Sequence, residues 1–282
     1  QLDQGQATNR GSLMNYLRLL ERFLDLITST KLVKEAQISG MENTFGKRET
    51  YKSIFRPEVL PNFTFTRLAA QLPQDAELID QYEIESDEEK MTVTILKREN
   101  DSKFFYHLMP TEYTLSEEYH MLLNLGRNVL SEHRPKAEEF TDPERTRTVF
   151  SNVARDMLSE LSKSKGISLT YRELTTLAKI LVRHTIGFGL IELLLLDQNL
   201  QDIVLNAPIT QNPIFVRHQK YDECVTNIIP SFEDTNSWAA KLRLASGRPL
   251  DEANPVLDTE ISFEKSRARV AVTTQPLSPK GL

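Results

Sequence analysis

Several features that mark common protein classes are absent from this 282-residue sequence. It has one cysteine, Cys224, which excludes an internal disulfide and a multi-cysteine zinc or iron–sulfur site. No apolar run reaches the roughly 18 residues that a membrane-spanning helix needs. The polar start of the chain also lacks the apolar core of a signal peptide. A reducing, intracellular compartment fits these absences best.

Basic charge and glycine are also in short supply. The chain carries 34 Lys and Arg against 40 Asp and Glu, a net charge of −6, and this balance disfavours a general nucleic-acid binder. Ten glycines occur, and none belongs to a GxxxxGK(S/T) loop, whose backbone N–H groups hold phosphates. The five histidines show no HExxH spacing. The sequence therefore contains neither a complete P-loop nor a zinc-protease motif.

The first half of the chain mixes helical and strand-like patterns. Leucines at three- and four-residue spacings predict a helix over residues 13–27. Residues 75–90 form an acidic run, which we interpret as a solvated surface segment or, alternatively, as a contact for a basic partner. Alternating β-branched residues predict strands over 91–96 and 102–109, joined as a hairpin, with a helix starting near Ser116.

The second half carries clearer helix boundaries. Thr141 with Glu144, and Thr170 with Glu173, have the capping-box spacing, so we expect a helix at each of these sites. The pattern then predicts a turn at 187–189, a short helix through Leu196, a strand over 202–206, a hairpin of 214–217 with 223–226, a helix capped by Asp234 or Thr235 and closed by Gly247, and strands over 256–261 and 267–274.

These patterns together predict an α+β fold. We expect a helical N-terminal subdomain with a small β-hairpin, followed by a compact α+β, PAS-like domain with an antiparallel sheet. The two predicted domains are residues 1–140 and 141–282. Their boundary lies near 135–145 or, alternatively, between 184 and 190.

The residues that suggest chemistry are a group of arginines near the C-terminal end. Arg267 and Arg269 stand two residues apart on a predicted strand and so share one face. Converging guanidinium groups suit bidentate contact with phosphate. The alternative is surface pairing with nearby carboxylates, and the residue types alone favour that alternative. The arginines are Arg243, Arg248, Arg267 and Arg269, and the nearby acidic residues are Asp251, Glu252, Asp258 and Glu260.

Three other reactive residues have no partner that the sequence identifies. We interpret Cys224, in a predicted strand, as a buried small hydrophobe. His184 lies on a predicted helix and His218 in a predicted hairpin turn, and neither is expected to act as a catalytic base. The residues by themselves therefore indicate an acidic α+β protein with a candidate anion-binding face.

Several segments of the second half resemble secretion ATPases, the hexameric motors of type II and type IV secretion, pilus assembly and the archaeal flagellum. Residues 187–206, GFGLIELLLLDQNLQDIVLN, resemble the G-x-G-x-(I/L)-E-x-L-L-x-D stretch of that family. Residues 246–258, SGRPLDEANPVLD, resemble its SGRPLDEAxPxLD motif. Shorter similarities occur at 213–218 (PIFVRH), 266–270 (SRARV) and 276–281 (PLSPKG), the last of which points to the archaeal branch. Residues 104–116 are similar to a further archaeal stretch, and residues 1–60 show no resemblance.

The resemblance implies that the chain is the N-terminal part of such a motor and precedes a RecA-like domain that would carry the P-loop and bind ATP with Mg²⁺. In the family, arginines of the N-terminal domain reach the nucleotide as arginine fingers do. Arg248 and Arg267 match those positions, and Arg269 is their neighbour. By itself the chain is then expected to be inactive.

The resemblance also implies partners and a location. The implied partners are the chain's own RecA-like domain, neighbouring subunits of a homohexamer and a membrane platform protein, with no nucleic acid. The implied location is the cytoplasmic face of the cell membrane, without a transmembrane segment. The alternative is a non-enzymatic adaptor or anion-binding module with the same fold.

Overall fold

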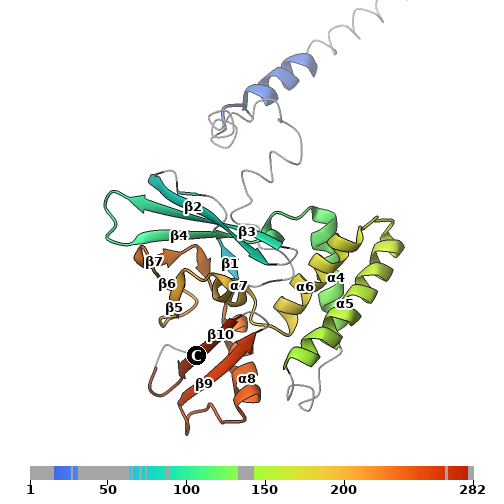
Figure 1. Ribbon diagram of the computed structural model, residues 1–282. Coiled ribbons are helices and arrows are strands. Elements are labelled where there is room, and N and C mark those ends of the chain that lie inside the picture. The colour runs from blue at the N-terminus through green and yellow to red at the C-terminus, as the bar shows by residue number, and fades with distance from the viewer. Residues whose placement is uncertain are drawn as a thin grey trace, which may run out of the picture. The chain divides into compact units, whose positions relative to one another are not determined.

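The computed structural model describes residues 16–26, 28–30, 64, 66–69, 72–73, 75–86, 89–132, 143–263 and 266–278 (Figure 1). The chain divides into two compact units, Gln1–Arg56 and Pro57–Leu282. In the first unit, residues 16–26 are helical, as the leucine spacing predicts. The rest of this account concerns the second unit.

A six-stranded sheet forms the centre of the second unit. Its strand order is β2–β3–β4–β7–β6–β5, and every neighbouring pair is antiparallel except β4 and β7, which are parallel. The strands are β2 (Ala76–Ser86), β3 (Glu89–Arg98), β4 (Phe104–Met109), β5 (Leu200–Val204), β6 (Phe215–His218) and β7 (Asp222–Thr226). The predicted α+β class and both predicted hairpins are confirmed, whereas the sheet is mixed and not purely antiparallel.

The acidic run forms the edge strand β2, which the sequence pattern did not reveal. Tyr82 and Ile84 turn towards the core, while Glu83 and Glu85 stay exposed. Lys90 on β3 pairs with both glutamates, at 3.5 and 2.6 Å. The sequence pattern did not predict this strand, because apolar and polar residues alternate over only part of its length. A bulge between Leu78 and Asp80 also interrupts its pairing register with β3.

The parallel β4–β7 pair joins strands from both sides of residue 140, where the sequence predicts a domain boundary. Phe104 lies opposite Cys224, and Tyr106 lies opposite Thr226. A parallel pair requires a long crossover connection, here more than a hundred residues that include four helices. No local sequence pattern predicts a pairing between strands that are so far apart in the chain.

One face of the sheet is covered by the short helix α7 (Leu190–Leu196). Leu190, Leu193 and Leu194 are buried in the main core together with side chains of the sheet. The sheet residues of this core include Met91, Val93, Ile95, Tyr106, Leu108, Val216 and Cys224. Because α7 follows the turn at 187–189, that turn fixes how the helix enters the core.

A second core lies within a bundle of three helices, α4 (Glu117–Glu132), α5 (Pro143–Lys165) and α6 (Tyr171–Thr185) (Figure 1). Leu122, Leu158 and Leu181 are fully buried among them. Thr170 caps α6, and its capping box with Glu173 is formed as predicted. The corresponding cap of α5 at Thr141 lies outside the described residues.

The C-terminal part combines helix α8 (Phe232–Ser246) with a ribbon of two strands, β9 (Val256–Phe263) and β10 (Ser266–Thr273). The prediction that Asp234 or Thr235 caps α8 is wrong. Ser231 is the cap: its hydroxyl accepts the Asp234 N–H, and the Asp234 carboxylate accepts the Ser231 N–H. The predicted stop at Gly247, with φ +63°, is confirmed. The short strands β1 (Arg67–Leu68) and β8 (Ile228–Ile229) and the 3-10 turn η2 (Thr111–Tyr113) complete the described elements.

Candidate functional site: an exposed arginine face

The β9–β10 ribbon separates an apolar face from a charged one. Leu257 and Ile261 on β9 are buried with Leu242 of α8, and Val270 of β10 packs against them. Arg267 and Arg269 lie on the opposite face, where their side chains are 73% and 79% exposed. Strand alternation therefore puts both predicted arginines on one solvent-facing surface.

Each of these arginines is held by a carboxylate on β9. Arg269 makes a bidentate contact with Asp258, with Nε to Oδ1 at 3.0 Å and Nη2 to Oδ2 at 2.5 Å. Arg267 Nε lies 2.8 Å from Glu260 Oε1. The hydrogen bond from Arg269 lowers the pKa of Asp258, and Asp258 in turn raises the pKa of Arg269. Both carboxylates were expected as candidate surface partners, and here they fill that role.

Arg248 joins the same group through the backbone. Its Nη1 donates to the Asp258 carbonyl oxygen at 3.2 Å, so Arg248 and Arg269 meet at one residue. Arg243 does not belong to this group, because its Nη1 donates to the Leu250 carbonyl at 3.3 Å. Asp251 is used locally, where it accepts the N–H groups of Ala253 and Asn254. The arginine face therefore consists of Arg248, Arg267 and Arg269.

A second charged group surrounds the turn at 187–189, and the sequence did not reveal it. Glu192 Oε1 accepts the Phe188 N–H at 2.7 Å and Nη2 of Arg147 at 2.5 Å. Lys241 of α8 donates to the Gly187 carbonyl. Burial lowers the pKa of Lys241 to about 8. The group thus ties α5, α7 and α8 to one turn.

A third, buried charge network joins the helix bundle to the sheet. Arg183 near the end of α6 contacts Glu89 Oε2 at 2.9 Å and Glu112 Oε2 at 3.3 Å. His184 Nε2 lies 3.0 Å from Glu112 Oε1. Burial raises the pKa of Glu112, but the Arg183 charge and the His184 hydrogen bond outweigh it and leave that pKa at about 2. Because its members are almost fully buried, the network is structural.

The other residues considered for chemistry also have structural environments. Cys224 is fully buried, and burial raises the pKa of its thiol to about 11. His218 Nδ1 accepts the N–H groups of Lys220 and Tyr221, and burial lowers the pKa of its ring. Asp197 accepts the hydroxyls of Tyr82 and Tyr106, at 2.5 and 2.8 Å. These arrangements hold loops against the core.

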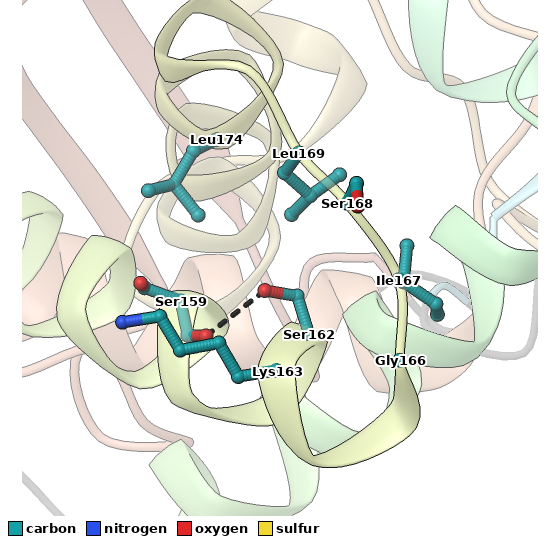
Figure 2. Close-up of a pocket in the computed structure, with 8 residues that line it drawn as sticks. All are labelled: Ser159, Ser162, Lys163, Gly166, Ile167, Ser168, Leu169 and Leu174. Atoms are coloured by element: carbon teal, nitrogen blue, oxygen red, sulfur yellow. Dashed lines mark hydrogen bonds between the residues drawn. The ribbon is translucent and has the colours of Figure 1, made fainter.

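A pocket of about 420 Å³ lies away from the arginine face, where α5 ends and α6 begins (Figure 2). Its lining residues are Ser159, Ser162, Lys163, Gly166, Ile167, Ser168, Leu169 and Leu174. None of the sequence-predicted arginines contributes to it.

Within the described residues, no group of three or more His, Cys, Asp or Glu side chains is placed to hold a metal ion. The arginine face offers hydrogen-bond donors and positive charge, which suit phosphate oxygens and not a cation. In the same part of the chain, no helix has the length and apolar character of a membrane span.

Comparison with known proteins places the chain near two archaeal sequences. Over 212 residues it is 25% identical to "Uncharacterized protein MJ0781" of Methanocaldococcus jannaschii, a match that covers 75% of this chain and 27% of that protein. Over 177 residues it is 28% identical to "Uncharacterized protein MJ1288" of the same organism, covering 60% of this chain and 67% of that protein. The chain thus spans about a quarter of the first relative's length and about two thirds of the second's. No protein-family model matches the chain.

Proposed function

We propose that this chain is the N-terminal, arginine-supplying part of a hexameric secretion or pilus-assembly ATPase. The observation that carries the proposal is the shared exposed face of β10, from which Arg267 and Arg269 project beside Arg248. An arginine finger must be solvent-accessible before its partner domain closes and must present its planar fork to phosphate oxygens. The arginine face meets the first requirement, and its guanidinium groups would meet the second once a nucleotide replaced Asp258 and Glu260 as their partners.

The segments that resemble the family support this assignment. Residues 187–206 form the turn, helix α7, which packs into the main core, and the edge strand β5. Residues 246–258 connect α8 to the arginine-bearing ribbon. The similarity to two Methanocaldococcus proteins agrees with the archaeal character of the PLSPKG segment.

In the proposed motor, ATP and Mg²⁺ are bound by a RecA-like domain. Arg248 and Arg267 stabilise negative charge on the transferring phosphoryl group, and Arg269, two residues after Arg267, supports them. Asp258 and Glu260 hold the guanidinium groups until the nucleotide replaces them as partners. Exposed pairs of this kind are weak, so such an exchange is energetically accessible.

The first test is the coding sequence beyond Leu282. The proposal expects a GxxxxGK(S/T) loop within about 50 residues of this position, after one strand–loop unit. A stop codon there would favour the non-enzymatic adaptor with the same fold.

The second test is kinetic and uses the protein that contains these residues together with that loop. Arg248→Gln and Arg267→Gln should each lower kcat for ATP hydrolysis by about 10³-fold or more, with much smaller changes in KM. Arg217→Gln removes another exposed, ion-paired arginine, which lies on β6, and should leave kcat unchanged. An unaltered kcat in both arginine-face variants would contradict the proposal.

The alternative, an independent anion-binding module, makes the opposite prediction for the isolated chain. Isothermal titration of residues 1–282 with ATP or phosphate would then show binding that Arg248→Gln and Arg267→Gln weaken. The motor proposal expects no such binding, because both domains are needed to hold the nucleotide.

We further assign the motor to the cytoplasmic face of the membrane, where it acts on a platform protein. The helix at residues 16–26 supports a contact with such a partner, since Leu19, Phe23 and Leu26 are each more than 60% exposed. Deletion of residues 1–60 should weaken membrane recruitment and leave ATP hydrolysis intact. Unchanged recruitment would refute this part of the proposal.

A further inference from the structure

The pocket between α5 and α6 has the size of a small-molecule site. Its volume of about 420 Å³ falls within the roughly 300–1,000 Å³ that is usual for such sites. Figure 2 shows side chains from the last turns of α5, the connecting loop and the first turn of α6 around one hollow.

Two helix-end motifs frame the pocket. Gly166, at φ +69°, reverses the chain after α5, and Ile167 N–H donates to the Ser162 carbonyl at 2.9 Å. This six-residue closure with a left-handed glycine is the Schellman arrangement. On the other side, the capping box of Thr170 with Glu173 fixes the start of α6. The walls are therefore set before any ligand arrives, which lowers the entropy cost of binding.

The lining combines one positive charge with an apolar wall. Lys163 is the single charged residue among the eight that line the pocket, and Ile167, Leu169 and Leu174 form the apolar side. Within the described part of the chain, the Lys163 ammonium and the hydroxyls of Ser159 and Ser168 have no intramolecular hydrogen-bond or ion-pair partner. These groups remain available to a ligand.

The neighbouring carboxylate, that of Glu173, is hydrogen-bonded to other residues. Glu173, next to the lining residue Leu174, accepts from the Thr170 hydroxyl and from the Tyr119 hydroxyl of α4, both at 2.7 Å. These hydrogen bonds lower the pKa of Glu173 and keep it ionised. It is therefore engaged by partners other than Lys163.

The geometry points to a binding site for a small aliphatic carboxylate, in which the acid group pairs with Lys163 and the hydrocarbon part contacts Leu169 and Leu174. The hydroxyl of Ser159, which lies on the same side of the hollow as the Lys163 ammonium in Figure 2, donates to the remaining carboxylate oxygen. A volume of this size suits a molecule of a few carbon atoms and therefore favours a metabolite over a docking protein. The site is separate from the arginine face and does not depend on the proposed ATPase role.

The test is an NMR titration of the ¹⁵N-labelled 282-residue chain with hexanoate. Binding should shift the amide signals of Ser162, Gly166, Ile167 and Leu169 in a saturable manner. Acetate lacks the hydrocarbon chain and hexanol lacks the charge, so each should bind at least about threefold more weakly than hexanoate. The ion pair between the acid group and Lys163 contributes up to about fivefold in affinity.

Two matched variants locate the charge contact. Lys163→Gln should weaken hexanoate binding about three- to fivefold, as expected for a partly exposed ion pair. Lys165→Gln removes a lysine two residues away that does not line the pocket and should leave the affinity unchanged. Amide spectra of both variants report whether the fold is retained.

The inference would be overturned by the absence of a saturable shift with hexanoate at 20 mM, by equal effects of the two lysine variants, or by shifts centred on the arginine face. Binding of an acidic peptide at these amides without any response to hexanoate would identify the site as a protein contact instead and would also reject it.

Discussion

The carboxylate of Glu192 occupies the space that a side chain at Gly187 would need. A Cβ added to Gly187 would overlap Glu192 Oε1 and also crowd the Arg183 carbonyl and the Arg147 guanidinium. The same Oε1 accepts the Phe188 N–H and the Arg147 side chain. Gly187 and Glu192 of the GFGLIE segment therefore pack directly against each other, and this contact sets the direction of α7.

Gly187→Ala should destabilise the protein by about 1–3 kcal/mol, because the added methyl group would displace a backbone carbonyl and a hydrogen-bonded carboxylate. Gly247→Asn is the matched control. Gly247 has a left-handed φ of +63° that asparagine tolerates, and a Cβ there meets no atom within 4 Å. Urea denaturation followed by circular dichroism measures both, and equal losses would contradict the steric explanation.

Arg183→Met should lower the free energy of unfolding by about 3–5 kcal/mol, because it leaves Glu89 and Glu112 buried without the Arg183 guanidinium. Arg172→Met, on an exposed position of the same helix, should not shift the denaturation midpoint measurably. The network would have to be reinterpreted as weakly coupled if the two variants unfolded at similar urea concentrations.

Lys241 should make the protein more stable as the pH rises above 8. Its pKa is about 8 when folded and about 10.5 when unfolded, so the unfolded chain holds a proton in this window that the folded chain has released. One pKa unit corresponds to about 1.4 kcal/mol. Between pH 8 and 10, the free energy of unfolding of the wild type should therefore rise by about 2 kcal/mol relative to that of Lys241→Met. Urea denaturation of both proteins across this pH range measures the difference. A constant difference between them would show that the amine is not desolvated.

Asp258→Asn should leave the urea midpoint unchanged, although it breaks the bidentate contact with Arg269. Both groups are exposed, and the water around them replaces most of what the ion pair contributes. Glu252→Gln gives the same change of charge and serves as the control. A clear loss of stability in Asp258→Asn alone would mean that the arginine face is a structural clamp, which would weaken its assignment to nucleotide contact.

Local signals predicted much of the secondary structure. The capping box of Thr170 with Glu173, the stop at Gly247 and the hairpin of β6 with β7 all depend on residues close in sequence. Where several candidate caps were adjacent, as at the start of α8, the choice depended on which hydroxyl reached an N–H, and Ser231 was missed. Strand β2 was missed because the bulge between Leu78 and Asp80 and several acidic residues obscure the alternation of its apolar residues.

The candidate site was only partly predictable. Strand alternation alone places Arg267 and Arg269 on one face, and their nearness to Asp258 and Glu260 follows from the β9–β10 pairing. The contact of Arg248 with the Asp258 carbonyl depends on the loop between α8 and β9. The pocket at Lys163 required both helix ends in place, since its walls come from two elements.

The sequence by itself determined the α+β class, the ends of several helices and the common face of the two arginines, because each of these follows from spacing along the chain. The tertiary structure decided the parallel pairing of β4 with β7, the meeting of Arg183 with Glu89 and Glu112, and the contact of Gly187 with Glu192 and Arg147. Burial and long-range contacts settle those features. Their energies depend on desolvation and close packing between distant segments, and no short stretch of sequence records either quantity.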